Sequence, residues 1–230
     1  MQPGRIGITA LITLLAATTP AFAPNFPVSF AAPPALAQTS ANRKAEADQL
    51  LEQGNKQLDT SQFQAALQSY QQALAIYKEI GDRSGEADSL NNVGRAYNNL
   101  GQYQKAIEFS QQSLVIAREI GSRQVEAKSL RNLGNAYGYV GQYQKEIEFY
   151  QQSLAITREI DDRQQEAKSL GNLGNAYFSL GQYQKAMEFF QQSLAIAREI
   201  GDRQQEAKSL GNLGVAYNSL GQYQKAIEFH

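Results

Sequence analysis

From about residue 42 onward the chain repeats one 40-residue pattern without an insertion. Residues 121–160 and 161–200 agree at 29 of 40 positions, and residues 161–190 agree with 201–230 at 25 of 30. Glycines recur at this spacing: Gly54, Gly94, Gly134, Gly174 and Gly214. Tandem copies of one unit bury their apolar faces by stacking on the next copy. The sequence therefore predicts a repeat array rather than a single closed core.

Each unit contains two helical patterns separated by a glycine. Apolar residues recur at spacings of three and four from about Arg83 to Leu100 and, after Gly101, from Tyr103 to about Ile120, which predicts two helices per unit. Gly121 is predicted to end the second helix, and N-caps are predicted at Asp82, Ser122, Asp162 and Asp202. The fold class is therefore all-α.

Glycines inside the first helix of each unit need a structural reason. A glycine such as Gly94 costs about 1 kcal/mol relative to alanine in a helix, so we expect it to allow a close crossing of the partner helix, with Ala106 opposite. The pair Gly171 and Gly174 could suggest a phosphate loop. Because no strand precedes it and both glycines lie mid-helix, packing is the favoured interpretation.

These residues resemble the tetratricopeptide repeat. Its signature is matched by Leu170, Leu173, Gly174, Tyr177, Ala186 and Phe190. The units are 40 residues long instead of 34, and basic residues replace the closing proline. Such long units are similar to those of Pins/LGN polarity adaptors, kinesin light chains and cyanobacterial arrays. The resemblance covers residues 47–230, with units at about 47–80, 87–120, 127–160, 167–200 and, partial, 207–230.

The resemblance implies a right-handed superhelical solenoid of antiparallel helix pairs whose first helices line a concave groove for an extended peptide. The residues themselves supply a compatible polar stripe, offset from the apolar face. The candidate groove residues are Asn92, Arg95, Lys128, Arg131, Asn132, Asn135, Lys168, Asn172, Asn175, Lys208 and Asn212. Unit one departs from this stripe with Asp48, Glu52 and Asn55, which predicts an acidic N-terminal end.

Asparagine side chains both donate and accept hydrogen bonds, so a ladder of them can pair with an extended main chain. Neighbouring cations would attract acidic side chains or a C-terminal carboxylate. The alternative is a solvated helix face whose asparagines were copied by duplication. The carboxylate clamp of chaperone-binding members is matched only in part, by Asn55, Asn92 and Lys128, because Leu51 and Asn132 replace its other basic residues.

Other recurrent residues are predicted to be structural. The Gln-Gln-Ser segments of the second helices are expected on a solvated convex face. Aromatic residues at helical spacing are expected in the core: Tyr97, Tyr103, Tyr137, Tyr143 and Tyr177. Tyr139 and Phe178 are expected beside the groove stripe, where they would form apolar pockets.

Composition excludes several function classes. The 21 basic and 22 acidic residues give no basic field for nucleic acid. The chain has no cysteine, and its only histidine is His230. Thiolate chemistry, histidine-based catalysis and a histidine metal cluster inside the fold are therefore excluded. No catalytic, cofactor-binding or metal-binding motif is found, so we expect no enzyme activity and no cofactor.

Residues 1–37 have the composition of a signal peptide. Arg5 is their only charged residue, and Ile6–Ala17 is an apolar run too short to span a membrane. Ala35 and Ala37 favour cleavage before Gln38, because the earlier candidate at Ala23 is followed by a proline. Residues 38–46 are then a linker, which we expect to begin with a short disordered lead-in from Gln38 to about Asn42. We expect export to the periplasm or exterior and no membrane contact afterwards; an uncleaved anchor is the alternative.

The sequence thus favours an exported adaptor that binds an extended, acidic protein segment. A second reading is a regulatory array of a larger enzyme, since similar cyanobacterial arrays often precede a caspase-like domain. A third is self-association through the partial fifth unit, which lacks most of its second helix.

Overall fold

A computed structural model describes residues 34–228. Within this range the chain forms only helices, ten in number, which confirms the all-α class. Their bounds are α1 Pro34–Asp59, α2 Phe63–Ile80, α3 Arg83–Asn99, α4 Tyr103–Glu119, α5 Arg123–Tyr139, α6 Tyr143–Glu159, α7 Arg163–Ser179, α8 Tyr183–Glu199, α9 Arg203–Ser219 and α10 Tyr223–Ile227.

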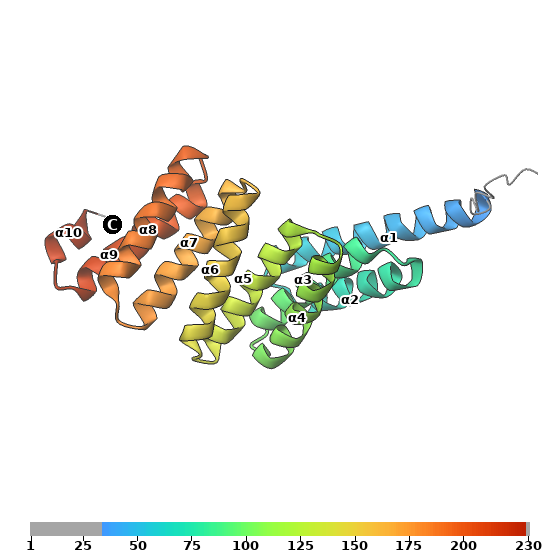
Figure 1. Cartoon of the computed structure of the whole chain (residues 1–230), viewed down its shortest axis with the longest axis horizontal. Helices are drawn as coiled ribbons and strands as arrows, with labels where there is room; N and C mark the ends of the chain where they lie inside the picture. The colour runs from blue at the N-terminus through green and yellow to red at the C-terminus, as the bar shows by residue number, and fades with distance from the viewer. Residues whose placement is uncertain (1–33, 229–230) are drawn as a thin grey trace, which may run out of the picture. The chain divides into compact units, whose positions relative to one another are not determined.

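The helices pack in chain order as pairs. The first pair is α1 with α2, and the following pairs are α3 with α4, α5 with α6, α7 with α8 and α9 with α10 (Figure 1). Each second helix also packs on the first helix of the following unit, and α3 contacts α5 as α7 contacts α9. A chain whose elements contact only near neighbours is a solenoid, so the predicted repeat architecture is confirmed.

Helix boundaries agree with the predicted capping residues. The Asp82 carboxylate accepts a hydrogen bond from the Gly85 amide at 2.9 Å, and Asp162 and Asp202 cap α7 and α9 in the same way. Ser122 precedes α5 but forms no side-chain capping bond. Gly121 has φ of 69°, the left-handed conformation in which glycine ends helices.

Helix α1 begins earlier than the sequence suggests. Residues 38–46, predicted as a linker with a disordered lead-in at 38–42, are helical. The predicted leader lies outside the described residues except for 34–37, the first turn of α1. Arg43 pairs with Glu79 of α2 at 2.5 Å, and Lys44 pairs with Asp82. Alanine, glutamine and charged residues favour helix even without an apolar period, and these pairs hold the helix against the following one.

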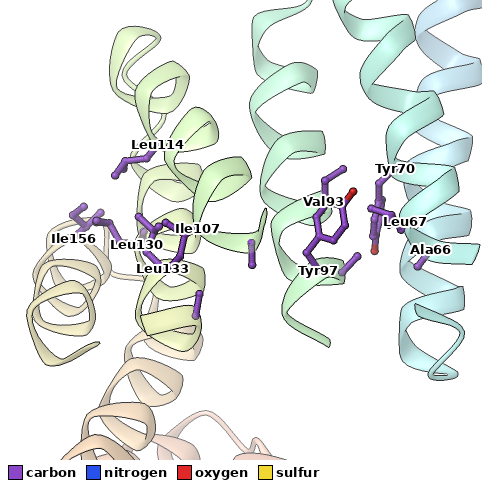
Figure 2. Packing of buried hydrophobic residues seen from close by; sticks show 14 residues of the cluster. Ala66, Leu67, Tyr70, Val93, Tyr97, Ile107, Leu114, Leu130, Leu133 and Ile156 are labelled. Carbon is purple, nitrogen blue, oxygen red and sulfur yellow. The ribbon is translucent and has the colours of Figure 1, made fainter. Parts of the chain in front are cut away.

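Buried apolar side chains fill the interfaces between consecutive helices. Figure 2 shows Val93 and Tyr97 of α3 facing Leu67 and Tyr70 of α2. A second group in the same view joins α4, α5 and α6 through Ile107, Leu114, Leu130, Leu133 and Ile156. Each unit thus completes its core with the next one.

The helix-interior glycines confirm the predicted close crossing. A Cβ atom at Gly174 would lie 2.4 Å from the Phe190 ring, and one at Gly134 would lie 2.6 Å from the Tyr150 ring. In unit two a Cβ at Gly94 would lie 2.5 Å from the Ser110 hydroxyl and 3.3 Å from the Ala106 carbonyl oxygen. The partner is therefore chiefly the residue sixteen positions later, and Ala106 contributes through its backbone.

The serines of the Gln-Gln-Ser segments are not solvated as predicted. Ser113, Ser153 and Ser193 are at most 1% exposed. Ser113 donates a hydrogen bond to the Ala87 carbonyl oxygen at 2.8 Å, and the other two do the same one and two units later. A small hydroxyl that bonds to the backbone of the paired helix is stable when buried, whereas the adjoining glutamines are exposed.

Only some of the tyrosines that were predicted to lie in the core are buried. Tyr97 and Tyr177 are buried, and Tyr97, Tyr137 and Tyr177 each stack on a phenylalanine of the following helix. The three partners are Phe109, Phe149 and Phe189. Tyr103 instead stacks on Tyr139, with ring centroids 4.7 Å apart, and Tyr139 is exposed.

Phe178, predicted beside the groove, packs against the core. Its ring also lies against Tyr183, with centroids 5.0 Å apart. A wholly apolar side chain gains more from core burial than from exposure on a polar stripe.

Across residues 34–228, every helix is too short or too polar to cross a lipid bilayer.

Candidate functional site

All eleven predicted groove residues lie in three adjoining pockets. The Arg95 pocket, about 410 Å³, is lined by six of them: Asn92, Arg95, Lys128, Arg131, Asn132 and Lys168. The Lys208 pocket, about 250 Å³, is lined by six: Arg131, Lys168, Asn172, Asn175, Lys208 and Asn212. The Glu146 pocket, about 340 Å³, is lined by Asn135, Asn172 and Asn175, together with Tyr139, Tyr143, Glu146 and Tyr150.

The pockets adjoin because they share residues. Arg131 and Lys168 line both the Arg95 and the Lys208 pocket, and Asn172 and Asn175 line both the Lys208 and the Glu146 pocket. We call the three together the groove surface. Its predicted residues all come from first helices, because positions three, four and seven apart share one helix face.

Cations on the groove surface lack acidic partners. Among the described residues, no ion pair is formed by Arg95, Lys128, Arg131, Lys168 or Lys208. Burial and neighbouring cations, chiefly Arg131, lower the pKa of Lys168. Burial and the charge of Arg95 likewise lower the pKa of Arg131. The groove surface therefore carries positive charge that the described part of the chain does not neutralise.

Arginines at the start of the first helices are paired, in contrast. Arg123 forms ion pairs with Glu126 at 2.5 Å and with Glu159, and Arg163 pairs with Glu166 at 2.5 Å and Glu199 at 2.6 Å. The difference shows that the repeat supplies carboxylates at the helix ends and leaves the groove cations without them.

The asparagines of the stripe are not equivalent. Asn132 is only 2% exposed, and its amide donates to the carbonyl oxygen of Asn91 at 3.0 Å and to its side-chain oxygen at 2.8 Å. Asn98 in turn donates to the Asn132 carbonyl oxygen at 3.1 Å. Asn132 therefore joins α5 to α3, and its predicted role in ligand contact is corrected, because both amide protons are already used.

Other asparagines remain accessible. Asn175 accepts a hydrogen bond from Asn212 at 3.1 Å, and Asn135 accepts one from the Tyr150 hydroxyl at 2.6 Å. Asn92 and Asn172 form no hydrogen bond with another described side chain and are half-buried. These two carry the free donors and acceptors that a peptide main chain needs.

The positions of the carboxylate clamp come together. Leu51, Asn55, Asn92, Lys128 and Asn132 all line the Arg95 pocket. Arg95 crosses this pocket to donate hydrogen bonds to Asn55 at 3.0 Å and to the Tyr70 hydroxyl at 3.1 Å. Three of the five positions thus carry the clamp's residues, whereas Leu51 and Asn132 are uncharged where the clamp has basic side chains.

The acidic N-terminal end differs in detail from the prediction. Asp48 accepts a hydrogen bond from the Tyr77 hydroxyl, and Glu52 pairs with Lys56 at 2.7 Å. The acids that line the Arg95 pocket are instead Asp59 and Asp88, and burial raises the pKa of Asp88. Their carboxylates reduce the positive charge of this pocket at one end.

Three residues of α6 also line the groove surface: Tyr143, Glu146 and Tyr150. They were not among the predicted groove residues, because that prediction considered only the polar face of the first helices. The signal was present in the alignment of units, because Glu146 stands where the other units have alanine. Among the described residues no cluster of acidic and histidine side chains could hold a metal ion.

A tetratricopeptide repeat family model matches residues 50–119, 85–159 and 162–230. No curated protein matches the chain.

Solved structures with the same fold include BtubC from P. vanneervenii, which is 21% identical over 84% of this chain and 85% of that one, with a TM-score of 0.66. Kinesin light chain-like repeats from Podosopora anserina are 26% identical over 81% of this chain and 92% of theirs, with a TM-score of 0.64. A Rap protein complexed with Competence and Sporulation Factor is 22% identical over 80% of this chain and 52% of its own length, with a TM-score of 0.74.

Proposed function

The chain belongs to the tetratricopeptide repeat family, and from this premise we propose that its groove surface binds an extended, acidic segment of a partner protein. Repeat scaffolds of this kind bind proteins or peptides, and the Rap neighbour is complexed with Competence and Sporulation Factor. An acidic ligand that lies along the groove surface is proposed because the cations of this surface have no ion-pair partners among the described residues.

The observation that carries the proposal is the row of unpaired cations. Lys128, Arg131, Lys168 and Lys208 follow one another across the Arg95 and Lys208 pockets. Burial, and after it the like charge of Arg131, lowers the pKa of Lys168. Acidic side chains of a ligand relieve this repulsion and form charge-assisted hydrogen bonds.

The asparagines supply sequence-independent contacts. The amides of Asn92 and Asn172 can each donate to a main-chain carbonyl and accept from a main-chain amide. Asn175 and Asn212 are already linked to each other, so a ligand meets a fixed pair there. Main-chain contacts of this kind provide affinity, and the cations provide preference for acidic segments.

A pull-down with the chain that begins at Gln38, followed by mass spectrometry, supplies the ligand. Replacing Asn172 and Asn175 by alanine should then weaken binding by an amount nearly independent of salt, because neutral hydrogen bonds worth roughly 0.5 to 1.5 kcal/mol each are lost. Replacing Lys128 and Lys168 by alanine should slow association and flatten its salt dependence.

Matched controls separate binding from folding. Lys105→Ala and Lys185→Ala remove cations that lie over tyrosine rings outside the groove surface, and they should leave binding unchanged. Leu173→Ala empties a buried site and sets the scale of a folding defect. If the groove variants bind like the parent, or melt as early as Leu173→Ala, the stripe is a solvated face and the proposal fails.

Export is part of the same proposal. Residues 1–37 are proposed as a leader removed before Gln38, which leaves the groove surface intact outside the cytoplasm. Mass spectrometry of the secreted chain checks this, since a terminus at Met1 or Pro24 contradicts it. The alternative, a regulatory array of a larger enzyme, is distinguished by reading the gene downstream of this sequence.

A further inference from the structure

One pocket of the groove surface differs from the other two in chemistry. The Arg95 and Lys208 pockets are lined by several cations, whereas Glu146 is the one carboxylate in the lining of its pocket, which contains no cation. Its other walls include the rings of Tyr139, Tyr143 and Tyr150. A carboxylate among aromatic rings is suited to a positively charged group.

Two neighbouring residues of the third unit, Glu146 and Gly138, differ from the residues at the same positions of the other units. The other units carry alanine at its position, as Ala66, Ala106, Ala186 and Ala226, and each of these is buried. Gly138 lies above it, where a Cβ atom would come within 2.6 Å of the Glu146 carboxylate oxygen. At this position the other units carry Leu58, Asn98, Phe178 and Asn218. Since alanine packs well at this position elsewhere in the array, core packing does not require a glutamate.

The carboxyl group is buried without a cation. Glu146 is 8% exposed and forms no ion pair with any described residue. Burial raises its pKa to about 7, although interaction with the Tyr150 hydroxyl opposes this rise. An unpaired buried acid destabilises the fold, so a bound cation would remove a cost that the free protein carries.

We propose that the Glu146 pocket receives the cationic side chain of a lysine or arginine in the bound peptide, an inference that rests on the proposed function. The ammonium or guanidinium group pairs with the Glu146 carboxylate. The tyrosine rings contact the cation and the methylene groups that precede it.

The groove surface then selects a ligand of mixed charge. The Glu146 pocket shares Asn172 and Asn175 with the Lys208 pocket, so a basic residue in the former places the adjoining residues near Lys168 and Lys208. Those neighbours are acidic in the preferred ligand. A wholly acidic segment meets the Glu146 carboxylate and is disfavoured by like-charge repulsion.

Short, terminally blocked Glu/Ser peptides that carry one lysine at successive positions test the inference, each paired with a peptide that has norleucine in place of lysine. In the best register the lysine peptide should bind about tenfold or more tightly than its norleucine partner. Glu146→Gln and Glu146→Ala should remove this difference. Glu148→Gln, which changes an exposed acid on the same helix, should retain it.

The two proposals fail in distinguishable ways. If norleucine and lysine peptides bind equally at every position, the groove function stands and the cation site is refuted. If no peptide binds, the proposed function is refuted. The cation site is then tested separately, by adding N-acetyl-lysine amide and following the NMR signals of the tyrosine rings. A saturable shift that is lost in Glu146→Gln supports the site, and an equal shift in both proteins overturns it. Glu146→Ala restores the residue of the other units, so its folding provides the control.

Discussion

Glycines inside the first helices of different units have different surroundings. Gly174 lies under the ring of Phe190, which is 1% exposed, whereas at Gly211 no atom beyond its own stretch of helix lies within 4 Å of the place where a Cβ would stand. Both are helix-interior glycines, three residues apart in the unit. The neighbour across the helix pair therefore decides whether glycine is required.

This difference predicts opposite effects of one substitution. Gly211→Ala should raise the free energy of unfolding by about 0.5 to 1 kcal/mol, because alanine has the higher helix propensity. Gly174→Ala should lower it by about 1 to 3 kcal/mol, because the new methyl group displaces a buried ring. Urea denaturation of both variants measures this. Equal stabilisation by the two would show that the Phe190 ring yields at no cost.

Glu146 predicts a pH-dependent stability. Its pKa is about 7 in the folded chain and 4.5 ordinarily, so between these values the folded state holds a proton that the unfolded state has lost. Stability from this group is therefore present below pH 4.5 and lost as the pH rises through 7. Burial raises the pKa of the neighbouring Tyr150 well above its ordinary value, so the hydroxyl of Tyr150 keeps its proton over this pH range.

Glu146→Gln should accordingly be more stable than the parent at pH 8, by up to about 3 kcal/mol, and similar to it at pH 4.5. Thermal melting at both pH values measures the difference. Glu148→Gln supplies the control, with no change in the gap expected. A constant gap between Glu146→Gln and the parent would contradict the raised pKa.

Pairs of helices are tied together by a repeated charge network. Glu166, 4% exposed, accepts from Arg158 at 2.8 Å and from Arg163 at 2.5 Å, which joins α6 to α7. Arg163 reaches on to the exposed Glu199 at 2.6 Å, at the end of α8. Arg163, at the start of α7, is thus linked through Glu166 to α6 of the preceding unit and directly to α8 of its own unit.

Burial should decide how much each end of this network contributes. Glu166→Gln should lower the free energy of unfolding by about 1 to 3 kcal/mol, because two arginines lose a buried charged acceptor. Glu199→Gln should cost less than about 1 kcal/mol and vary with salt, because its partner is screened by water. Denaturation midpoints at low and high salt test both. A larger loss at Glu199 would contradict this assignment.

Along the whole array, stability depends on how many neighbours a unit has. Ile147 is a residue of α6, in the middle of the array, and is 3% exposed. The equivalent Ile227 of α10 is 68% exposed, and Tyr223 beside it is 64% exposed. Because solenoid stability is the sum of units and interfaces, the described end of the array should open before its middle.

This gradient predicts unequal costs for the same truncation. Ile147→Ala should destabilise the array by about 2 to 5 kcal/mol, the range for emptying a buried aliphatic site. Ile227→Ala should change stability by less than about 0.5 kcal/mol, as for an exposed position. Hydrogen exchange should also show faster amide exchange in α10 than in α6. A large loss of stability in Ile227→Ala would instead indicate that this end is covered in solution, for example by a second copy of the chain.

The period, the helix pairs and most helix boundaries follow from the sequence alone. They depend on local properties: the spacing of apolar residues, the aspartates before α3, α7 and α9, and the glycines after second helices. The groove residues were found for the same reason, since a helix face is fixed by spacing of three and four.

Only the tertiary structure decides what each face meets. Spacing places Asn132 and Asn172 at equivalent positions, yet Asn132 is closed off by Asn91 of the neighbouring unit and Asn172 is not. The buried serines and the Glu146 pocket arise in the same way, from side chains on another helix. Copies of one unit have the same local forces but different neighbours, and burial, hydrogen bonding and charge at a site depend on those neighbours.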